Sequence, residues 1–191
     1  MLPPGHAQLP MGRRVQGGCP VTLSGLKAKY ASEWPRSNAR EAVALAWLRA
    51  LGVDARPCGH GALEPGEVEG YHTGPWDRFD LYAPGLRLWF EVTGTRWRRQ
   101  DSARRFSRAV LPVLKAKVDD AERYGIGERL WFVSVNEVEG EVRFLSCAEA
   151  KCHPLIAFAR GEGEYYGVGW DHWLRPARAL AFFAREAVRS G

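Results

Sequence analysis

The 191-residue sequence lacks the long apolar segments that place a protein in or across a membrane. No stretch approaches the roughly 18 consecutive apolar residues that span a bilayer, so the sequence predicts no transmembrane helix. The first residues include Pro3, Pro4 and Pro10 and lack the apolar core of a secretory signal peptide. We therefore expect a cytoplasmic protein that is neither secreted nor bound to a membrane.

Cysteine is scarce, and its spacing does not favour a metal site. The chain has four cysteines: Cys19, Cys58, Cys147 and Cys152. None belongs to a Cys-x-x-Cys pair, which structural zinc sites usually contain. Two looser combinations exist: Cys58 with His60, and Cys147 with Cys152 and His153. Free thiols in a reducing compartment are the interpretation we favour.

The remaining composition is that of an ordinary globular protein, with 46% hydrophobic and 26% charged residues. A chain of this length is expected to form one domain with a substantial core. Residues 1–35 are rich in proline, glycine and basic residues, and we interpret them as a partly irregular N-terminal arm with one short helix over 26–34. Residues 36–191 are predicted to form a single α/β domain.

Positive charge is concentrated in one short segment. The net charge is +5, and between residues 96 and 108 the arginines face a single acid, Asp101. Arginine binds phosphate through two parallel hydrogen bonds, so this cluster predicts affinity for nucleic acid that does not depend on base sequence. A solvated basic helix is the alternative. The arginines are Arg96, Arg98, Arg99, Arg104, Arg105 and Arg108.

The first predicted helix runs from Ser37 or Asn38 to Gly52. Its apolar residues recur at helical spacing, and Gly52 is a typical residue to end it. Asn38 and Glu41 have the spacing of a capping box, in which each side chain caps a backbone N–H of the first turn.

A second helix is predicted over 111–124, where Pro112 either begins the helix or kinks a longer one that starts near Asp101. Buried strands are predicted over 130–135, 142–146 and 165–170, and a final helix over 173–188. Residues 56–76 are predicted to form a long loop with a short strand over 68–72.

Two acidic residues occupy facing positions of a predicted β-hairpin. Two apolar runs flank Pro84 and Gly85, which suit the centre of a type II turn. Closing the hairpin there brings the carboxylates of Asp80 and Glu91 to the same end of adjacent strands. Because two buried acids repel unless a cation lies between them, the pair predicts a site for a hard cation that also holds a phosphodiester. Two acids on a solvated sheet face are the alternative.

These residues, in this order, resemble the PD-(D/E)XK nuclease superfamily, and within it the archaeal Holliday-junction resolvases and small restriction-type enzymes. That family has a helix with a glutamate, then a hairpin with Asp and Glu-x-Lys, then a helix and a strand. Here Glu41 lies on the first helix, and Asp80 and Glu91 on the hairpin strands. The resemblance covers about residues 37–146. It implies an α/β, restriction-endonuclease-like α-β-β-(β)-α-β core with a mixed central sheet flanked by helices.

Two residues depart from the family pattern. Phe79 stands where the family usually has a proline before the aspartate, which is a minor change. Thr93 stands where the family has the lysine of Glu-x-Lys. The superfamily is known to supply this lysine from the next helix, so the resemblance makes Lys117 the leading substitute, with Lys115 second. An ordinary helix-surface lysine is the alternative for Lys117.

The resemblance implies a divalent-metal-dependent DNA endonuclease. Asp80, Glu91 and the carbonyl of Val92 would hold one Mg²⁺ or Mn²⁺. Lys117 would stabilise the transition state, and Glu41 would complete the metal shell, with a helix-capping role as its alternative. A two-fold homodimer would suit an enzyme that cuts both strands. DNA phosphates would be bound by Arg96, Arg98, Arg99, Arg104 and Arg105.

Other functions fit parts of the sequence. Thr93 favours a non-catalytic nucleic-acid-binding protein with a degenerate nuclease fold. Cys19, Cys147 and Cys152 partly match the cysteine pattern of iron–sulphur nucleases. A protein-interaction or structural domain is the third alternative, in which the aromatic residues at strand spacing form only core, as we expect of all five. These residues are Trp131, Phe132, Tyr165, Tyr166 and Trp170.

Overall fold

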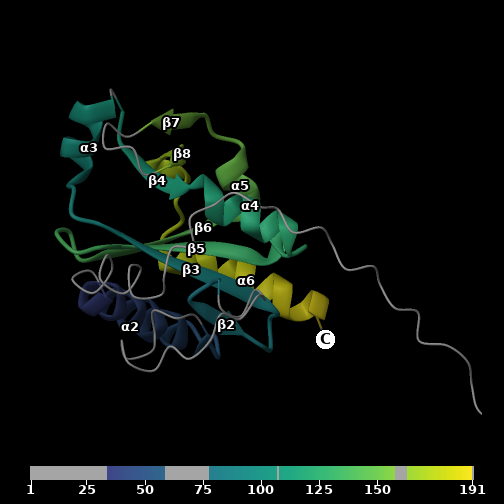
Figure 1. Cartoon of the computed structure of the whole chain (residues 1–191). Coiled ribbons are helices and arrows are strands. Elements are labelled where there is room, and N and C mark those ends of the chain that lie inside the picture. Colours follow the sequence, from purple (N-terminus) through teal and green to yellow (C-terminus); the bar gives the residue numbers. More distant parts are fainter. Residues whose placement is uncertain (1–33, 59–77, 107, 158–162, 191) are drawn as a thin grey trace, which may run out of the picture.

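The computed structural model describes residues 34–58, 78–106, 108–157 and 163–190, which form an α/β fold (Figure 1). One sheet has five strands, in the order β1 (Arg56–Pro57), β2 (Leu81–Ala83), β3 (Leu88–Thr95), β5 (Leu130–Asn136) and β6 (Glu141–Ser146). A second sheet has three, in the order β4 (Val110–Leu114), β8 (Glu164–Gly169) and β7 (Leu155–Ala157). The helices are α2 (Trp34–Ala50), α3 (Arg99–Phe106), α4 (Lys115–Arg123), α5 (Cys147–Lys151) and α6 (Pro176–Ser190), with 3-10 turns η3 (Gly127–Arg129) and η4 (Trp170–His172).

The five-stranded sheet is mixed, because β3 runs parallel to β5 and antiparallel to β2. Its pairing with β5 extends from Trp89 to Thr95, whereas its pairing with β2 ends at Phe90. The second half of β3 therefore extends past Leu81, the first residue of β2. The predicted α/β class with a mixed central sheet flanked by helices is confirmed.

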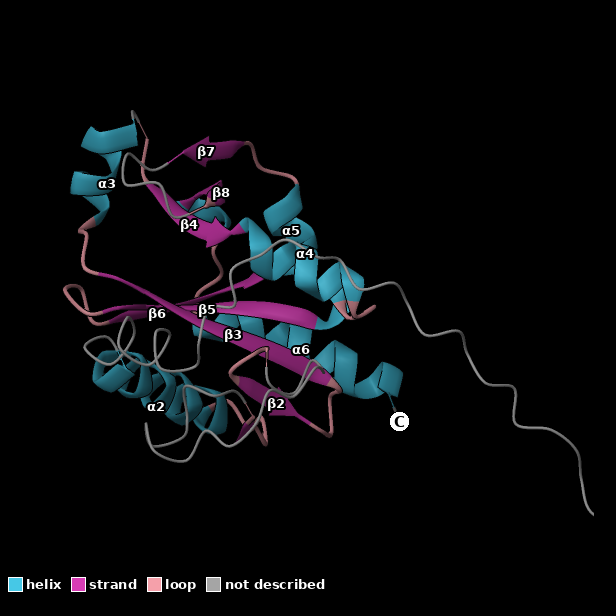
Figure 2. Ribbon diagram, viewed as in Figure 1, coloured by secondary structure: helices cyan, strands magenta, loops and turns pink. Residues whose placement is uncertain are grey.

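Alternation along β3 and β5 directs side chains into two cores on opposite faces of this sheet. Phe90 and Val133 pack with α2 and α6, whereas Trp89 and Phe132 pack with β4, α4 and α5. Figure 2 shows α2 and α6 on one side of the five-stranded sheet, and α4, α5 and the three-stranded sheet on the other. β3 is thus covered on both faces.

The prediction of a helix over 111–124 is wrong in its first residues. β4 occupies them and pairs with β8, and α4 begins only at Lys115. Pro112 has no N–H to donate, but β4 lies at the edge of its sheet, where proline is tolerated. Ser102 fixes the start of the strand, since its hydroxyl bonds both the carbonyl and the N–H of Val110. An apolar run of this length does not distinguish strand from helix.

The capping box predicted at the start of the first helix is also wrong. α2 begins at Trp34, so Asn38 and Glu41 lie inside the helix and not at its first turn. The predicted end is confirmed, because Gly52 follows the helix with a φ of 76°, which glycine adopts readily.

The hairpin turn is longer than predicted, and its register differs from that of a two-residue turn over 84–85, which would set Asp80 opposite Trp89. Residues 84–87 connect β2 to β3, and Arg87 among them has a φ of 53°. A two-residue type II turn splays the strands of a hairpin, which the longer turn avoids. The register of β2 against β3 sets Asp80 opposite Glu91.

The other predicted strands are confirmed with small shifts, as β5, β6 and β8. The last helix begins at Pro176, because Leu174 forms a β-bridge with Phe144 of β6. The alternative of one long helix from Asp101, kinked at Pro112, is wrong, because α3 ends at Phe106 and β4 follows it. The loop predicted over 56–76 begins with a short strand, β1. The arm over 1–35 lies outside the described residues, except that α2 includes its last two; the strand over 68–72 also lies outside them. None of the described helices is both long and apolar enough to cross a membrane.

Candidate active site

Asp80 comes immediately before β2 and lies opposite Glu91 of β3, on the sheet face that packs against α4. The backbone N–H of Val92 donates to Oδ2 of Asp80 at 2.6 Å. The Asp80 carboxylate thereby satisfies a backbone donor of β3 beyond the last residue that pairs with β2. The structure brings this pair together as the sequence predicts.

α2 brings a third carboxylate to the same place. Glu41 is only 4% exposed, and its Oε1 accepts a hydrogen bond from the hydroxyl of Ser37 at 3.2 Å. Within the described residues, Oε2 of Glu41 has no hydrogen-bond partner. A buried carboxylate oxygen without a partner is costly, which indicates that another group satisfies it in the working protein.

α4 brings an amine into contact with these acids. Nζ of Lys117 lies 2.8 Å from Oε2 of Glu91 and donates to the carbonyl of Arg78 at 2.6 Å. The ring of Phe79 lies beneath it, with its centroid 5.6 Å from Nζ. An amine therefore reaches the acidic pair although position 93 is a threonine.

Lys115, the second candidate for this role, points elsewhere. Its Nζ pairs with Asp119 at 2.6 Å, one helical turn further along α4. Only Lys117 of the two contacts the acidic pair.

Burial raises the pKa of all three carboxyls. Burial and then the charge of Asp80 raise the pKa of Glu91 from 4.5 to about 8, against the effect of Lys117. The same two causes, in that order, raise the pKa of Glu41 to about 7. The pKa of Asp80 is raised by burial, against Lys117 and the Val92 N–H. Burial lowers the pKa of Lys117, but Glu91 and Asp80 outweigh it and the net shift is upward. One amine thus faces more acidic groups than it can neutralise.

The donor set at this site fits a hard divalent cation. Asp80, Glu91 and Glu41 offer carboxylate oxygens, and Val92 adds a carbonyl at the same edge of β3. Mg²⁺ and Mn²⁺ prefer such oxygen ligands. A divalent charge would also remove the repulsion among the acids and give the free Oε2 of Glu41 a partner.

A cleft of about 500 Å³ extends from Glu91 and Lys117 between the two sheets. β3 lines one wall, and β4 and Tyr165 of β8 line the other. Tyr165 is half-buried and lines the cleft, so the prediction that it is only core is wrong, whereas Tyr166, also half-buried, packs against the core. The other three aromatic residues are core as predicted: Trp131, Phe132 and Trp170.

Arg40 of α2 also lines this cleft and was not predicted from the sequence. Its Nε donates to Glu137 at 2.6 Å. Its guanidinium lies over Gly94, where a Cβ would come within 2.1 Å of Nε. Gly94 therefore allows the arginine to lie against β3. The sequence signal is faint: Arg40 is one arginine among many beside Glu41.

The predicted DNA-binding arginines lie after β3, some at the cleft and some away from it. Arg96 lines the cleft and pairs with Glu137 at 3.2 Å. Arg98 is exposed, and Arg99 is held by Asp171 at 2.6 Å.

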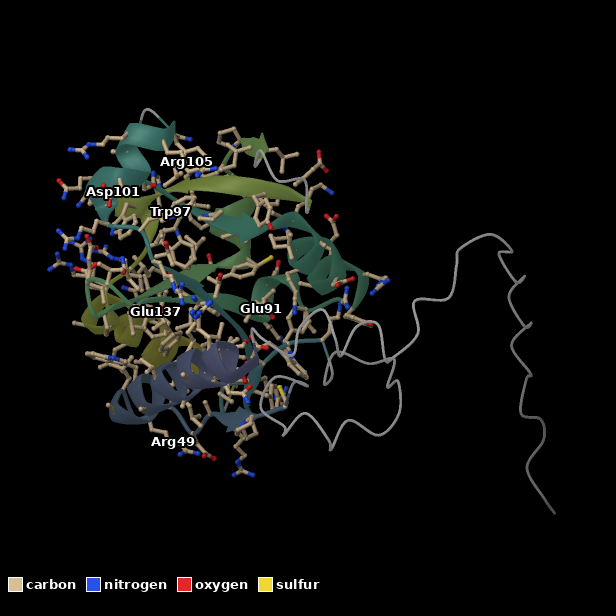
Figure 3. The ribbon with its side chains drawn as sticks, turned by 60° about the vertical axis from the view of Figure 1, so that its left-hand side comes forward. Arg49, Glu91, Trp97, Asp101, Arg105 and Glu137 are labelled. Carbon is tan, nitrogen blue, oxygen red and sulfur yellow. The ribbon has the colours of Figure 1, made fainter. Side chains whose placement is uncertain are left out.

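The arginines of α3 lie further from the acids. Arg104 is exposed, 3.8 Å from Asp101, and the guanidinium of Arg105 lies 5.0 Å from the ring centroid of Trp97. Figure 3 shows Trp97, Asp101 and Arg105 together near α3, away from Glu91.

Free thiols are the state of the cysteines that the structure describes. Cys58, Cys147 and Cys152 are all free. Burial raises the pKa of Cys147 to about 11, which makes it an unreactive thiol. Cys19 and His60, which the other interpretations need, lie outside the described residues.

Comparison with known proteins gives relatives among viral and archaeal nucleases. A family model described as viral/archaeal nuclease matches residues 48–155. A curated relative, uncharacterised protein D-244 of Sulfolobus spindle-shape virus 1, is 28% identical over 106 residues, which are 51% of this chain and 43% of that protein. The chain thus spans less than half the length of this relative.

Two solved structures are similar in fold. The fusellovirus nuclease D212 is 20% identical, with a TM-score of 0.50 over 88% of this chain and 96% of D212. The Holliday junction resolvase Hjc of Archaeoglobus fulgidus is 15% identical, with a TM-score of 0.43 over 74% of this chain and 98% of Hjc. The resemblance to nucleases drawn from the helix and hairpin motif is confirmed by the family match. Because that match covers more than half of its residues, the chain belongs to the viral/archaeal nuclease family.

Proposed function

We propose that the chain is a divalent-metal-dependent DNA endonuclease that hydrolyses phosphodiester bonds. The observation that carries this proposal is the contact of the Lys117 amine with Glu91, next to Asp80 and Glu41. It gives the site three acids and an amine despite Thr93, the main feature that favours a degenerate, non-catalytic member of the family.

Asp80, Glu91 and the carbonyl of Val92 would hold Mg²⁺ or Mn²⁺. Such an ion, when bound, lowers the pKa of a bound water molecule and neutralises charge on a phosphodiester. Glu41 contributes an oxygen that is otherwise without a partner among the described residues, so it would complete the ligand shell.

Lys117 has the properties of a transition-state stabiliser. It stays charged because the neighbouring acids raise its pKa, and its bond to the Arg78 carbonyl helps fix its position. A fixed cation interacts more strongly with a phosphorane than with a diester, since the phosphorane carries more negative charge.

The cleft offers a path for the DNA backbone. Arg40 and Arg96 line it beside the acids, and Arg98 and Arg99 follow on the segment that leaves β3. Arginines bind phosphates without reading bases, so these contacts would position the strand.

Cleavage of a closed circular plasmid tests this proposal, because a circle has no ends for an exonuclease. We expect nicked and linear products with Mg²⁺ or Mn²⁺ and none with a chelator. Asp80→Asn and Glu91→Gln should each abolish cleavage, whereas Asp54→Asn, which changes an exposed acid that pairs with Arg56, should not.

A second measurement separates the catalytic from the non-catalytic alternative. DNA binding that weakens steeply with salt, without cleavage under any divalent metal, would show a degenerate nuclease that only binds nucleic acid. Cleavage that survives both substitutions would show that the site is elsewhere.

A further inference from the structure

Two histidines and a glutamate meet at a place remote in sequence from the acids of the nuclease site. Glu149 lies on α5, His153 follows that helix, and His172 ends η4. Oε1 of Glu149 lies 3.2 Å from Nε2 of His153 and 2.8 Å from Nδ1 of His172. The two imidazole rings pack edge to face, with centroids 4.5 Å apart.

This arrangement directs one nitrogen of each ring at the same carboxylate oxygen. If hydrogen bonds alone held it, each facing nitrogen would carry a proton. A metal ion replaces both protons, and the lone pairs of neutral imidazoles then point at the ion.

The spacing of the three donor atoms suits such an ion. They lie within 4.8 Å of one another. Ligand atoms of a zinc ion, each about 2.0–2.2 Å from the metal, are about 3–4 Å apart. Small side-chain rotations would therefore bring all three into the coordination shell.

We propose that Glu149, His153 and His172 form a second metal site, specific for zinc or a similar borderline-soft ion. Two nitrogen donors distinguish it from the oxygen-only site at Asp80 and Glu91, which suits Mg²⁺. His172 is about half exposed, so the site is open to ions from solvent. Three protein ligands leave a fourth position to water.

The position of this site indicates a structural role. α5 directly follows β6 of the five-stranded sheet, and η4 directly follows β8 of the three-stranded sheet. An ion held by both segments would therefore link the five-stranded sheet to the three-stranded sheet. Binding to the folded chain alone raises its stability in proportion to the logarithm of the ion concentration.

Zinc binding to the full chain, measured by competition with a chromophoric chelator in excess Mg²⁺, tests this inference. The Mg²⁺ occupies oxygen sites and leaves nitrogen sites to zinc. We expect one zinc ion per chain, and a rise in the thermal midpoint on adding zinc. His153→Gln and His172→Gln should each weaken binding by about 100-fold or more, since even residues that only support a ligand contribute about 10–100-fold. Glu128→Gln, an exposed acid on the neighbouring η3, should leave the affinity unchanged.

A measurement on the unsubstituted chain covers the case in which a histidine variant does not fold. Zinc should shift the ring nitrogen signals of two of the five histidines, and those two should show a mutual nuclear Overhauser effect because their rings are in contact. No zinc binding, binding that both variants retain, or shifts confined to histidines without this contact would each overturn the proposal. These outcomes are independent of whether the chain cleaves DNA.

Discussion

The amine of Lys117 lies 2.8 Å from Oε2 of Glu91, although 26 residues separate them in the sequence. The two residues come from different elements, α4 and β3, which meet because β4 and α4 cover one face of the central sheet. Position 93, two residues after Glu91, is a threonine, so the hairpin itself provides no lysine there. The chain therefore supplies the amine from a helix.

We predict that Lys117→Ala lowers the rate of DNA cleavage far more than it lowers DNA affinity. A group that acts on transition-state charge changes kcat, whereas a plain phosphate contact changes binding to the ground and transition states alike. The expected loss in kcat is about 10²-fold or more, as for other preorganised charge stabilisers. Single-turnover cleavage and DNA binding in Ca²⁺ measure the two quantities separately.

Lys115→Ala is the matched control for this substitution. Lys115 lies on the same helix but pairs with Asp119, so its loss should leave kcat nearly unchanged. Equal, small effects from both substitutions would mean that neither lysine takes part in catalysis.

Glu41→Gln should raise the Mg²⁺ concentration needed for half-maximal cleavage, because Glu41 would complete the metal shell. The free energy of unfolding of this variant should not be lower than that of the parent, since Oε2 of Glu41 has no partner within the described residues and Asp80 repels the ionised carboxylate. Ser37→Ala removes only the hydrogen bond to Oε1 and should change the Mg²⁺ requirement much less. An unchanged Mg²⁺ requirement in Glu41→Gln would assign Glu41 a structural role.

Much of this acidic cluster is foreseeable because it depends on local register. A hairpin closed near Pro84 brings Asp80 and Glu91 towards the same end of adjacent strands, but their direct pairing depends on the longer turn over 84–87. Glu41 is foreseeable only through the family resemblance, because its sequence neighbourhood equally suits a helix cap. The structure removes that ambiguity by starting α2 one turn earlier.

The errors in the predicted fold come from contacts that sequence periodicity does not report. Residues 110–114 have the pattern of an apolar helix start, yet they form a strand because β8, more than 50 residues later, offers a partner. The cleft exists because that second sheet stands beside β3. The apolar pattern around Tyr165 therefore predicts a core position, whereas its side chain lies at the wall of the cleft.

Neutralising Arg96, Arg98 and Arg99 together to glutamine should weaken DNA binding broadly across sequences. Each phosphate that is no longer neutralised by an arginine lowers the slope of log affinity against log salt by about 0.9, so the slope should fall by up to about three units. Titrations at several salt concentrations measure it. The ion pairs of Arg96 and Arg99 with acids reduce their free charge, so Arg98 should account for a large share of the effect.

Arg49→Gln is the control for this experiment. Arg49 is exposed at the end of α2, and Figure 3 shows it on the side of that helix away from Glu91. Its substitution removes the same charge without touching the proposed path. A slope that changes equally in this variant, or not at all in the triple variant, would place the DNA elsewhere on the surface.

The raised pKa values of the acids make the stability of the metal-free protein depend on pH. Glu91 and Glu41 have pKa values of about 8 and about 7 in the folded chain, against an ordinary value of 4.5. Between these limits the folded state binds more protons than the unfolded state. The contribution of these two groups to the free energy of unfolding is therefore greatest below pH 4.5, and it is lost as the pH rises towards 8.

We predict that the free energy of unfolding of the metal-free protein contains a component that falls between about pH 5 and pH 8, and that Mg²⁺ opposes this fall. Mg²⁺ binds ionised carboxylates, so its stabilising effect should be larger at pH 8 than at pH 5. Denaturant titrations with and without Mg²⁺ measure both trends. The double variant Glu41→Gln, Glu91→Gln should show a flatter pH dependence and little response to Mg²⁺, whereas Glu128→Gln should behave as the parent. A parent and double variant with the same pH dependence would show that these acids do not carry the shifted protons, and an equal response to Mg²⁺ would place its binding site elsewhere.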